Sequence, residues 1–236
     1  MPFGQLKRDR INSKLQLYYL GYYEDFQVQQ KKAYGPLIRN YLVDTVDEIL
    51  AAVEALPSIL IFRADLRFPD DMPRGSMHDS NQVLTTFFRY FKEEIKRASK
   101  AYKPFFRYVW TREQDTSQKP HYHVLIMLNY NVFRSIGKME SNEYGVYLRD
   151  NLYHRMMRCW YRAMGRFETE PHGQLIHIGE DPITGKLWTG NLRRNNWDSI
   201  NQAVYNASYL CKQYSKRFGE GIRVFQTSQG SHTKNR

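Results

Sequence analysis

The sequence predicts an α+β domain in which helices flank an antiparallel sheet. Two observations predict it: short aromatic and β-branched runs alternate with longer segments of helical periodicity, and two of the short runs lie close enough to form a hairpin. A chain of 236 residues can also bury a sizeable core without disulfides or a structural metal.

The N-terminal part is predicted to be helical. From about Lys14 to Leu56 apolar residues recur at helical spacing, and Pro57 closes the run. We therefore expect residues 1–57 to form a helical extension and residues 58–226 to form the main domain. The polar residues 227–236 are expected to be a disordered tail.

The first strand, first covering helix and central hairpin come next. Residues 58–68 begin as an apolar run and then alternate apolar with charged residues, as a strand does. Residues 81–100 carry their apolar side chains on one helical face. Residues 105–112 and 121–128 are rich in aromatic and β-branched residues and are separated by a polar segment, which predicts an antiparallel hairpin.

The C-terminal half adds two helices and short strands. Residues 144–164 and 198–217 have helical periodicity, whereas residues 174–178 are typical of a strand, and residues 219–226 can add an edge strand. Residues 181–185 form a turn motif that leads to a further short strand. Strand, helix, hairpin, helix, strand is an order compatible with a ferredoxin-like or RRM-like antiparallel sheet.

The charge balance makes nucleic acid the leading partner. Lys and Arg number 35 against 24 Asp and Glu, giving a formal net charge of +11 that attracts a polyanion. Such a balance alone also occurs in ribosomal and membrane-surface proteins. The 18 Tyr and 13 Phe suit a binder of single strands, since every base offers a face for stacking, although most of these rings are expected in the core.

The cysteines and the hydropathy pattern indicate a cytoplasmic protein. Cys159 and Cys211 lie in segments of helical pattern and lack the spacing of a zinc or redox site. No apolar run approaches 20 residues, so neither secretion nor membrane insertion is expected.

A histidine pair is the first candidate site. His121 and His123 stand two apart on a predicted strand, so both imidazoles project from the same face and can grip one metal. The partner strand ends in Glu113, which the hairpin can bring beside them, while Asp65 and Asp115 are rival carboxylates. Two imidazoles and one carboxylate leave open coordination positions, and this set suits Mn²⁺ or Mg²⁺.

Two tyrosines and a lysine form the second candidate site. Tyr205, Tyr209 and Lys212 stand at i, i+4 and i+7 in a helical pattern, which would place them on one face. A phenol is a weak nucleophile at its reference pKa near 10. A nearby cation or a metal-held phosphate assists it, whereas the alternative is a Tyr-rich helix that only packs on the sheet.

Together the two motifs resemble the HUH endonucleases. They resemble more closely the inovirus-type gene-two replication proteins and the YagK/YfjJ C-terminal domain family of prophage-like elements. The resemblance spans roughly residues 58–216, and its specific parts are ILIFRADLRF, WTREQDTSQKPHYHVLIMLN and YNASYLCK.

The resemblance implies roles for individual residues. His121 and His123 match the metal-binding pair, and Glu113 matches the carboxylate that precedes it. Tyr209, three residues before Lys212, matches the nucleophile, and Tyr205 matches the second tyrosine of two-tyrosine members. The family implies cleavage of one DNA strand at an origin, leaving a 5′-phosphotyrosine and a free 3′-hydroxyl. Because the covalent bond retains the phosphodiester energy, rejoining needs no nucleotide cofactor.

The expected function is therefore metal-dependent nicking and rejoining of single-stranded DNA in rolling-circle replication of a phage, prophage or plasmid element. A relaxase or transposase of the same chemistry is one alternative, and a non-enzymatic, basic RRM-like binding module is another. The sequence carries no helicase P-loop, so a host helicase is an expected partner. His172 and His177 are interpreted as structural or DNA-contacting rather than as metal ligands.

Overall fold

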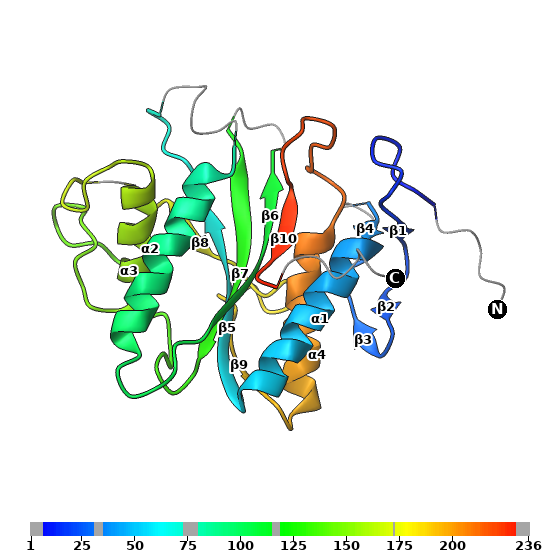
Figure 1. The fold of residues 1–236 in the computed structure, drawn as a ribbon, viewed down its shortest axis with the longest axis horizontal. Helices are drawn as coiled ribbons and strands as arrows, with labels where there is room; N and C mark the ends of the chain where they lie inside the picture. Colours follow the sequence, from blue (N-terminus) through cyan, green and yellow to red (C-terminus); the bar gives the residue numbers. More distant parts are fainter. Residues whose placement is uncertain (1–6, 31–34, 73–79, 115–118, 172, 230–236) are drawn as a thin grey trace.

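A computed structural model describes residues 7–30, 35–72, 80–114, 119–171 and 173–229 of the chain. It has an α+β fold in which one antiparallel sheet stands between two pairs of helices (Figure 1). The predicted fold class is therefore confirmed. Within the described ranges, none of the helices combines the length and the apolar composition needed to cross a membrane.

The sheet has six strands, and all of its pairings are antiparallel. The order β10-β6-β7-β5-β8 runs across it, and β9 pairs with the first half of β5 while β8 pairs with the second half. The strands are β5 (Ser58–Leu66), β6 (Phe106–Glu113), β7 (His121–Asn129), β8 (Ile176–Ile178), β9 (Thr189–Arg193) and β10 (Phe225–Thr227). The expected hairpin is β6 and β7.

One face of the sheet is covered by α2 (Gln82–Ala98) and α3 (Leu152–Ala163). Alternate strand residues such as Phe62 and Ile126 point into this core, where they pack with Phe87 and Trp160. The elements β5, α2, β6, β7, α3 and β8 follow the β-α-β-β-α-β order of a ferredoxin-like unit, as expected.

The opposite face is covered by α1 (Arg39–Ala55) and α4 (Trp197–Ala207), which lie on the other side of the sheet in Figure 1. Ile61, Leu125 and Met127 point into this second core. A short 3-10 helix, η2 (Ser208–Cys211), continues directly from α4. Helices thus pack on both faces of the sheet, and its strand ends remain available for a polar site.

The N-terminal segment differs from its prediction, because the helix begins only at Arg39. In the described part of the chain before it, residues 7–30 and 35–38, lie four two-residue strands: β1 (Leu17–Tyr18), β2 (Tyr22–Tyr23), β3 (Phe26–Gln27) and β4 (Leu37–Ile38). β1 pairs with β4 and β2 with β3, and the apolar side chains join the core under α1 and α4. The apolar residues before Arg39 are thus buried by tertiary packing of extended chain, whereas those from Tyr41 to Val53 lie in α1 as expected.

The C-terminus is ordered slightly further than expected. β10 includes Thr227, and the Gln229 amide donates to the carboxylate of Glu48 on α1. The rest of the predicted disordered tail, residues 230–236, lies outside the described residues.

Candidate metal centre

The register of the hairpin brings the histidine pair and the glutamate together. Glu113 stands opposite His121, and Thr111 stands opposite His123. Since side chains alternate along β7, both histidines share the face of Leu125 and Met127, which is the α1/α4 face. The three side chains therefore meet at the end of the sheet where β6 ends and β7 begins (Figure 1).

The three groups are close enough to bind one ion. One ligand atom from each of Glu113, His121 and His123 lies within 4.8 Å of the others. The Nε2 atoms of the two histidines are 3.2 Å apart, and His123 Nε2 lies 3.3 Å from Glu113 Oε2. His123 and Glu113 are buried, whereas His121 is partly exposed. The cluster is thus enclosed on the protein side and accessible through His121.

Asp65 supports this cluster from the other neighbouring strand. It stands opposite His123 in the pairing of β5 with β7, and its Oδ1 lies 2.5 Å from His123 Nδ1. A carboxylate on the far nitrogen of a histidine fixes the ring and directs the other nitrogen to a metal. Asp65 therefore orients His123, which leaves Glu113 as the carboxylate of the three-residue cluster. The other rival, Asp115, lies outside the described residues.

The charges around the cluster separate the two histidines. Burial lowers the pKa of His121 to about 4, and the neighbouring His123 acts in the same direction. Burial also acts to lower the pKa of His123, but the Asp65 and Glu113 carboxylates outweigh it and raise that pKa. Burial acts to raise the pKa of Asp65, but His123 and Arg63 outweigh it and hold the pKa at about 2. His121 is thus neutral at pH 7, as a metal ligand must be.

Glu113 is held by three groups from the segment after η2. Lys216 Nζ lies 3.0 Å from Oε1, while Lys212 Nζ lies 3.0 Å from Oε2, and Ser215 Oγ donates to Oε2 at 2.7 Å. Burial acts to raise the pKa of Glu113, but Lys216, His123 and Lys212 outweigh it and hold that pKa well below its usual range. The carboxylate is therefore ionised, with Oε2 directed toward the histidines.

Tyr209 of η2 lies beside the cluster. Its ring meets the His123 ring edge to face, with 5.2 Å between centroids. Lys212 Nζ lies 3.8 Å from the ring centroid, and the Arg63 guanidinium lies 4.4 Å from it. Arg63 has room there because a Cβ at Gly179 would come within 2.4 Å of it. A phenol, two cations and the candidate metal ligands thus share one site.

The second tyrosine is not brought to this site, and the reason is the end of α4. The predicted helix over residues 198–217 ends at Ala207, so Tyr209 and Lys212 do not continue the helical face of Tyr205. Tyr205 instead lines a separate cavity with residues of β2, β3 and the turn after β8. The prediction that all three residues share one helical face is therefore wrong.

Comparison with known protein families identifies the chain. A family model, the YagK/YfjJ C-terminal domain, matches residues 22–228. The chain belongs to the YagK/YfjJ C-terminal domain family. It is 25% identical to the uncharacterized protein YagK of Escherichia coli (strain K12) over 188 residues, or 73% of this chain and 84% of YagK.

A second relative matches over a shorter range. The uncharacterized protein YfjJ of Escherichia coli (strain K12) is 27% identical over 124 residues, or 52% of this chain. That match covers 55% of YfjJ, so it spans about half the length of that relative. No solved structure matches the chain significantly.

Sequence reasoning missed several residues of this YagK/YfjJ domain site. Arg63 alternates with Asp65 on β5, so period-2 spacing could have placed both on one face. Ser215 and Lys216 carried no signal, because their place depends on where the chain turns after η2. His177 stands opposite Asp65 in β8, on the face of the cluster but outside the three-residue ligand group. His172 lies outside the described residues.

The residues present fit a divalent cation. Two imidazole nitrogens and an ionised carboxylate converge, and one imidazole already has a carboxylate on its second nitrogen, as metal-bound histidines do. The set combines imidazole nitrogen with carboxylate oxygen, as protein sites for divalent transition metals do. His121, His123 and Glu113 would hold the ion, with Asp65 behind them.

Proposed function

We propose that the protein cuts and rejoins one strand of DNA through Tyr209, at a divalent cation held by His121, His123 and Glu113. The observation that carries the proposal is the position of Tyr209. The 3-10 helix η2, far along the chain from the hairpin, packs the Tyr209 ring edge to face against His123, a candidate metal ligand. Lys212, which follows η2, lies close to both the Tyr209 ring and Glu113. If Tyr209 served only to pack against the sheet, it would need neither a cation nor an ionised carboxylate nearby.

The proposed reaction is a transfer of a phosphodiester to the phenol. The Tyr209 oxygen bonds to phosphorus, and the bond from phosphorus to the 3′-oxygen of the preceding nucleotide breaks. The phenolic proton is released to solvent, and the leaving 3′-oxygen takes up a proton from solvent. The products are a 5′-phosphotyrosine and a free 3′-hydroxyl, whose attack on the same phosphorus reverses the step and frees the phenol. A bound divalent cation supplies positive charge to the phosphate oxygens.

The chain's own residues have separate parts in this proposal. Lys212 and Arg63 hold positive charge beside the phenol, where negative charge develops as its proton leaves. Lys216 neutralises Oε1 of Glu113, which keeps Oε2 directed toward the histidines. Asp65 fixes the His123 ring.

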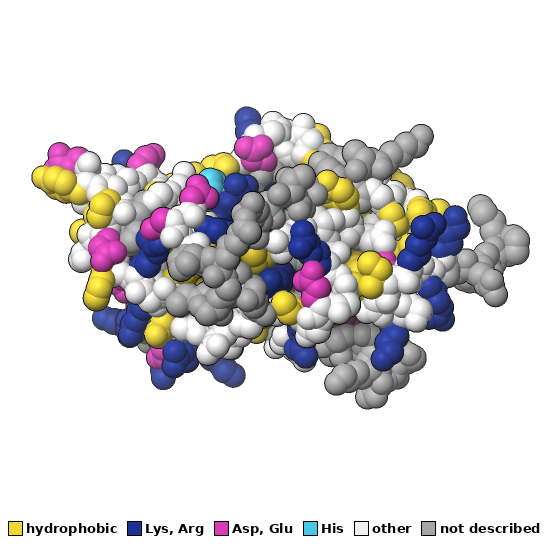
Figure 2. Space-filling model, turned by 90° about the horizontal axis from the view of Figure 1, so that it is seen from above, with side chains coloured by type: hydrophobic (Ala, Val, Ile, Leu, Met, Phe, Trp, Pro, Cys, Tyr) yellow, Lys and Arg dark blue, Asp and Glu magenta, His cyan; other side chains and the backbone are white. Residues whose placement is uncertain are grey.

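The biological role that we propose is initiation of rolling-circle replication of a phage, prophage or plasmid element, with strand separation by a host helicase. The net charge of +11 supports a nucleic-acid substrate. Figure 2 looks onto the end of the molecule above the sheet and shows several Lys and Arg side chains across its middle. A relaxase or a transposase would use the same chemistry on a different DNA site.

The test is cleavage of end-labelled single-stranded oligonucleotides that tile the DNA flanking the gene, with Mn²⁺ and with EDTA. We expect one oligonucleotide to be cut at one position in Mn²⁺ and to remain intact in EDTA. Glu113→Gln keeps the shape of the side chain but removes its charge, and we expect it to bind the same oligonucleotide without cutting. Binding of all oligonucleotides with no cutting of any would contradict the proposal and favour an RRM-like binding module.

A further inference from the structure

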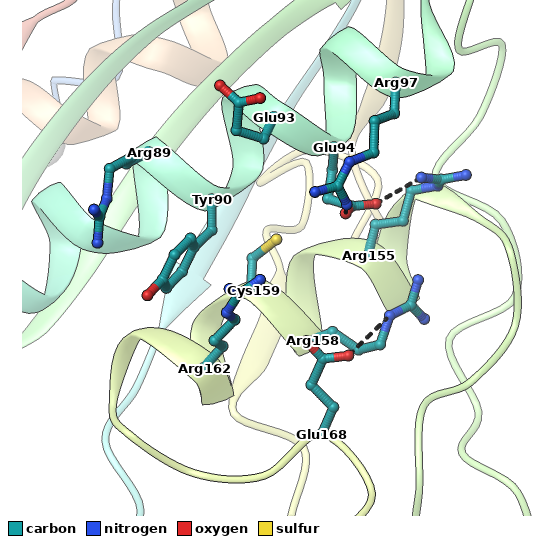
Figure 3. A pocket seen from close by; sticks show the side chains of 10 residues that line it. All are labelled: Arg89, Tyr90, Glu93, Glu94, Arg97, Arg155, Arg158, Cys159, Arg162 and Glu168. Carbon is teal, nitrogen blue, oxygen red and sulfur yellow. Dashed lines mark hydrogen bonds and ion pairs between the residues drawn. The ribbon is translucent and has the colours of Figure 1, made fainter.

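A cleft between α2 and α3 lies on the face of the sheet opposite the metal centre (Figure 3). It encloses about 310 Å³. Guanidinium groups from both helices dominate its lining, and carboxylates are fewer. The residues that line it are Arg89, Tyr90, Glu93, Glu94, Arg97, Arg155, Arg158, Cys159, Arg162 and Glu168. Five arginines against three glutamates leave the cleft with a net positive charge.

Two of the glutamates are engaged by three of the arginines. Glu94 accepts from Arg155 at 2.7 Å and also pairs with Arg97. Glu168 lies 3.9 Å from Arg158, whose guanidinium donates to backbone carbonyls as well. Three of the five arginines that line the cleft are therefore held in ion pairs.

The other two arginines, Arg89 and Arg162, lie over the ring of Tyr90. Their guanidinium carbons are 4.9 Å and 4.2 Å from the ring centroid, and they come from different helices. Both are exposed, and neither forms an ion pair with a described residue. Figure 3 shows the carboxylate of Glu93 directed away from Tyr90 and Arg162. The mouth of the cleft thus presents two guanidinium groups whose charge is not neutralised.

A second cleft adjoins the first across α2, and Arg89 and Glu93 line both. The second cleft adds Lys92 and Arg223 together with the aromatic side chains of Tyr108 and Trp110. Tyr108 is half-buried and stacks on Phe88 with 4.1 Å between ring centroids. Cationic side chains therefore line both clefts along α2, and the half-buried ring of Tyr108 lines the second one.

We propose that this surface, from the α2/α3 cleft to Tyr108, binds the sugar-phosphate backbone of a single strand of nucleic acid. Guanidinium groups match phosphate oxygens in geometry as well as charge, and the half-buried Tyr108 beside them leaves part of its ring accessible to a base. A compact anion would need only one of the clefts, whereas the shared position of Arg89 fits a ligand that continues from one cleft to the other. The surface is separate from the metal centre and does not depend on cleavage.

The experiment measures binding of fluorescent oligo-dT to the full chain in EDTA, which removes any contribution from metal chemistry. Arg89→Ala/Arg162→Ala removes the two unpaired guanidinium groups. Arg10→Ala/Lys14→Ala is the control, because both residues are exposed and lie on the N-terminal segment, away from α2 and α3. We expect the first variant to bind about tenfold more weakly and to lose about 1.4 units of the salt slope, whereas the control stays close to the parent protein.

Three results would overturn the proposal. The first is an unchanged affinity of the Arg89→Ala/Arg162→Ala variant. The second is an equal loss in the control, which would mean that only total charge matters. The third is displacement of oligo-dT by a mononucleotide at equal phosphate concentration, which would assign the α2/α3 cleft to a small phosphorylated ligand. Thermal melting of both variants checks that a loss of binding is not a loss of folding.

Discussion

His121, His123 and Glu113 could be grouped from the sequence because their placement depends on local rules. Side chains alternate along a strand, and a hairpin fixes which residues stand opposite each other. The partners Asp65 and Lys216 could not be assigned in this way, since one depends on which strand joins the hairpin and the other on a turn after η2. The sequence therefore predicted that these three side chains lie together, whereas the contacts of Asp65 and Lys216 with them required the tertiary structure.

Replacement of either histidine tests the ligand assignment. We expect His121→Ala or His123→Ala to abolish saturable Mn²⁺ binding in calorimetry and to abolish cutting, while most DNA affinity remains, because cations and aromatic rings supply that affinity. His177→Ala is the matched control and should bind Mn²⁺ as the parent does, since His177 lies outside the ligand group. Cutting by either ligand variant in metal-replenished buffer would refute the assignment.

Replacement of Asp65 tests its orienting role. Asp65→Asn keeps the size of the side chain but removes the charge that acts on His123 Nδ1. We expect Mn²⁺ affinity to fall by about 10- to 100-fold, as is typical when such a partner is lost. We also expect the pKa of His123 to fall, because the Asp65 carboxylate is one of the groups that raise it. Calorimetry and an NMR titration of the imidazole measure the two effects, and an unchanged Mn²⁺ affinity would contradict this role.

At the scale of elements, the end of α4 shows where periodicity fails. The pattern over residues 198–217 reads as one helix, but Ser208 donates its hydroxyl to the Tyr205 carbonyl, and the Gln29 side chain donates to the same carbonyl. These two hydrogen bonds lie where α4 ends and the 3-10 helix η2 begins, and this change of helix type turns Tyr209 toward the sheet. Gln29 is 176 positions away from Tyr205, so no local pattern could reveal the contact.

The turn after β8 gives a prediction on stability. Asp181 Oδ1 accepts from the amides of Ile183 and Thr184, and its Oδ2 accepts from Asn206 of α4. Burial acts to raise the pKa of Asp181, but these hydrogen bonds outweigh it and lower the pKa. Because the folded pKa lies below the unfolded one, the stabilisation is complete above the unfolded pKa and is lost as the pH falls through the folded pKa.

We therefore expect Asp181→Ala to lower the free energy of unfolding by about 2 kcal/mol at neutral pH, since several donors lose their acceptor. The difference from the parent should begin to shrink near the unfolded pKa of about 4, and should continue to shrink as the pH falls through the lower folded pKa, where the parent carboxylate becomes protonated. Urea unfolding at several pH values measures both. Glu180→Ala is the control, because that residue is exposed, and a difference that stays constant with pH would contradict the assignment.

At the scale of the whole molecule, strand and helix order was sufficient to predict the layers on the α2/α3 face but not those on the opposite face. The β-α-β-β-α-β order follows from periodicity and the hairpin signal. The packing of α1 beside α4 joins the two ends of the chain, and the short strands β1 to β4 are too short for any alternation to be detected. Long-range pairing of this kind has no local signature.

The charge of the whole molecule gives a prediction on binding. With a net charge of +11, affinity for single-stranded DNA should fall steeply with salt, because neutralised phosphates release their counterions. We expect the logarithm of the binding constant, measured by fluorescence anisotropy, to fall with the logarithm of the salt concentration with a slope of about −2 or steeper. Such a slope corresponds to several phosphate contacts. A flat dependence would show that the basic surface does not bind DNA.

The central claim is that Tyr209 is the nucleophile, and the direct measurement is the site of the covalent adduct. A cleaved oligonucleotide trapped on the protein is digested, and the modified peptide is identified by mass spectrometry. We expect the phosphotyrosine at Tyr209, and we expect Tyr209→Phe to lose adduct and cutting because one oxygen is removed with little change in packing. Tyr205→Phe should still form the adduct, since Tyr205 lines a different cavity. An adduct at Tyr205, with Tyr209→Phe still active, would contradict the account.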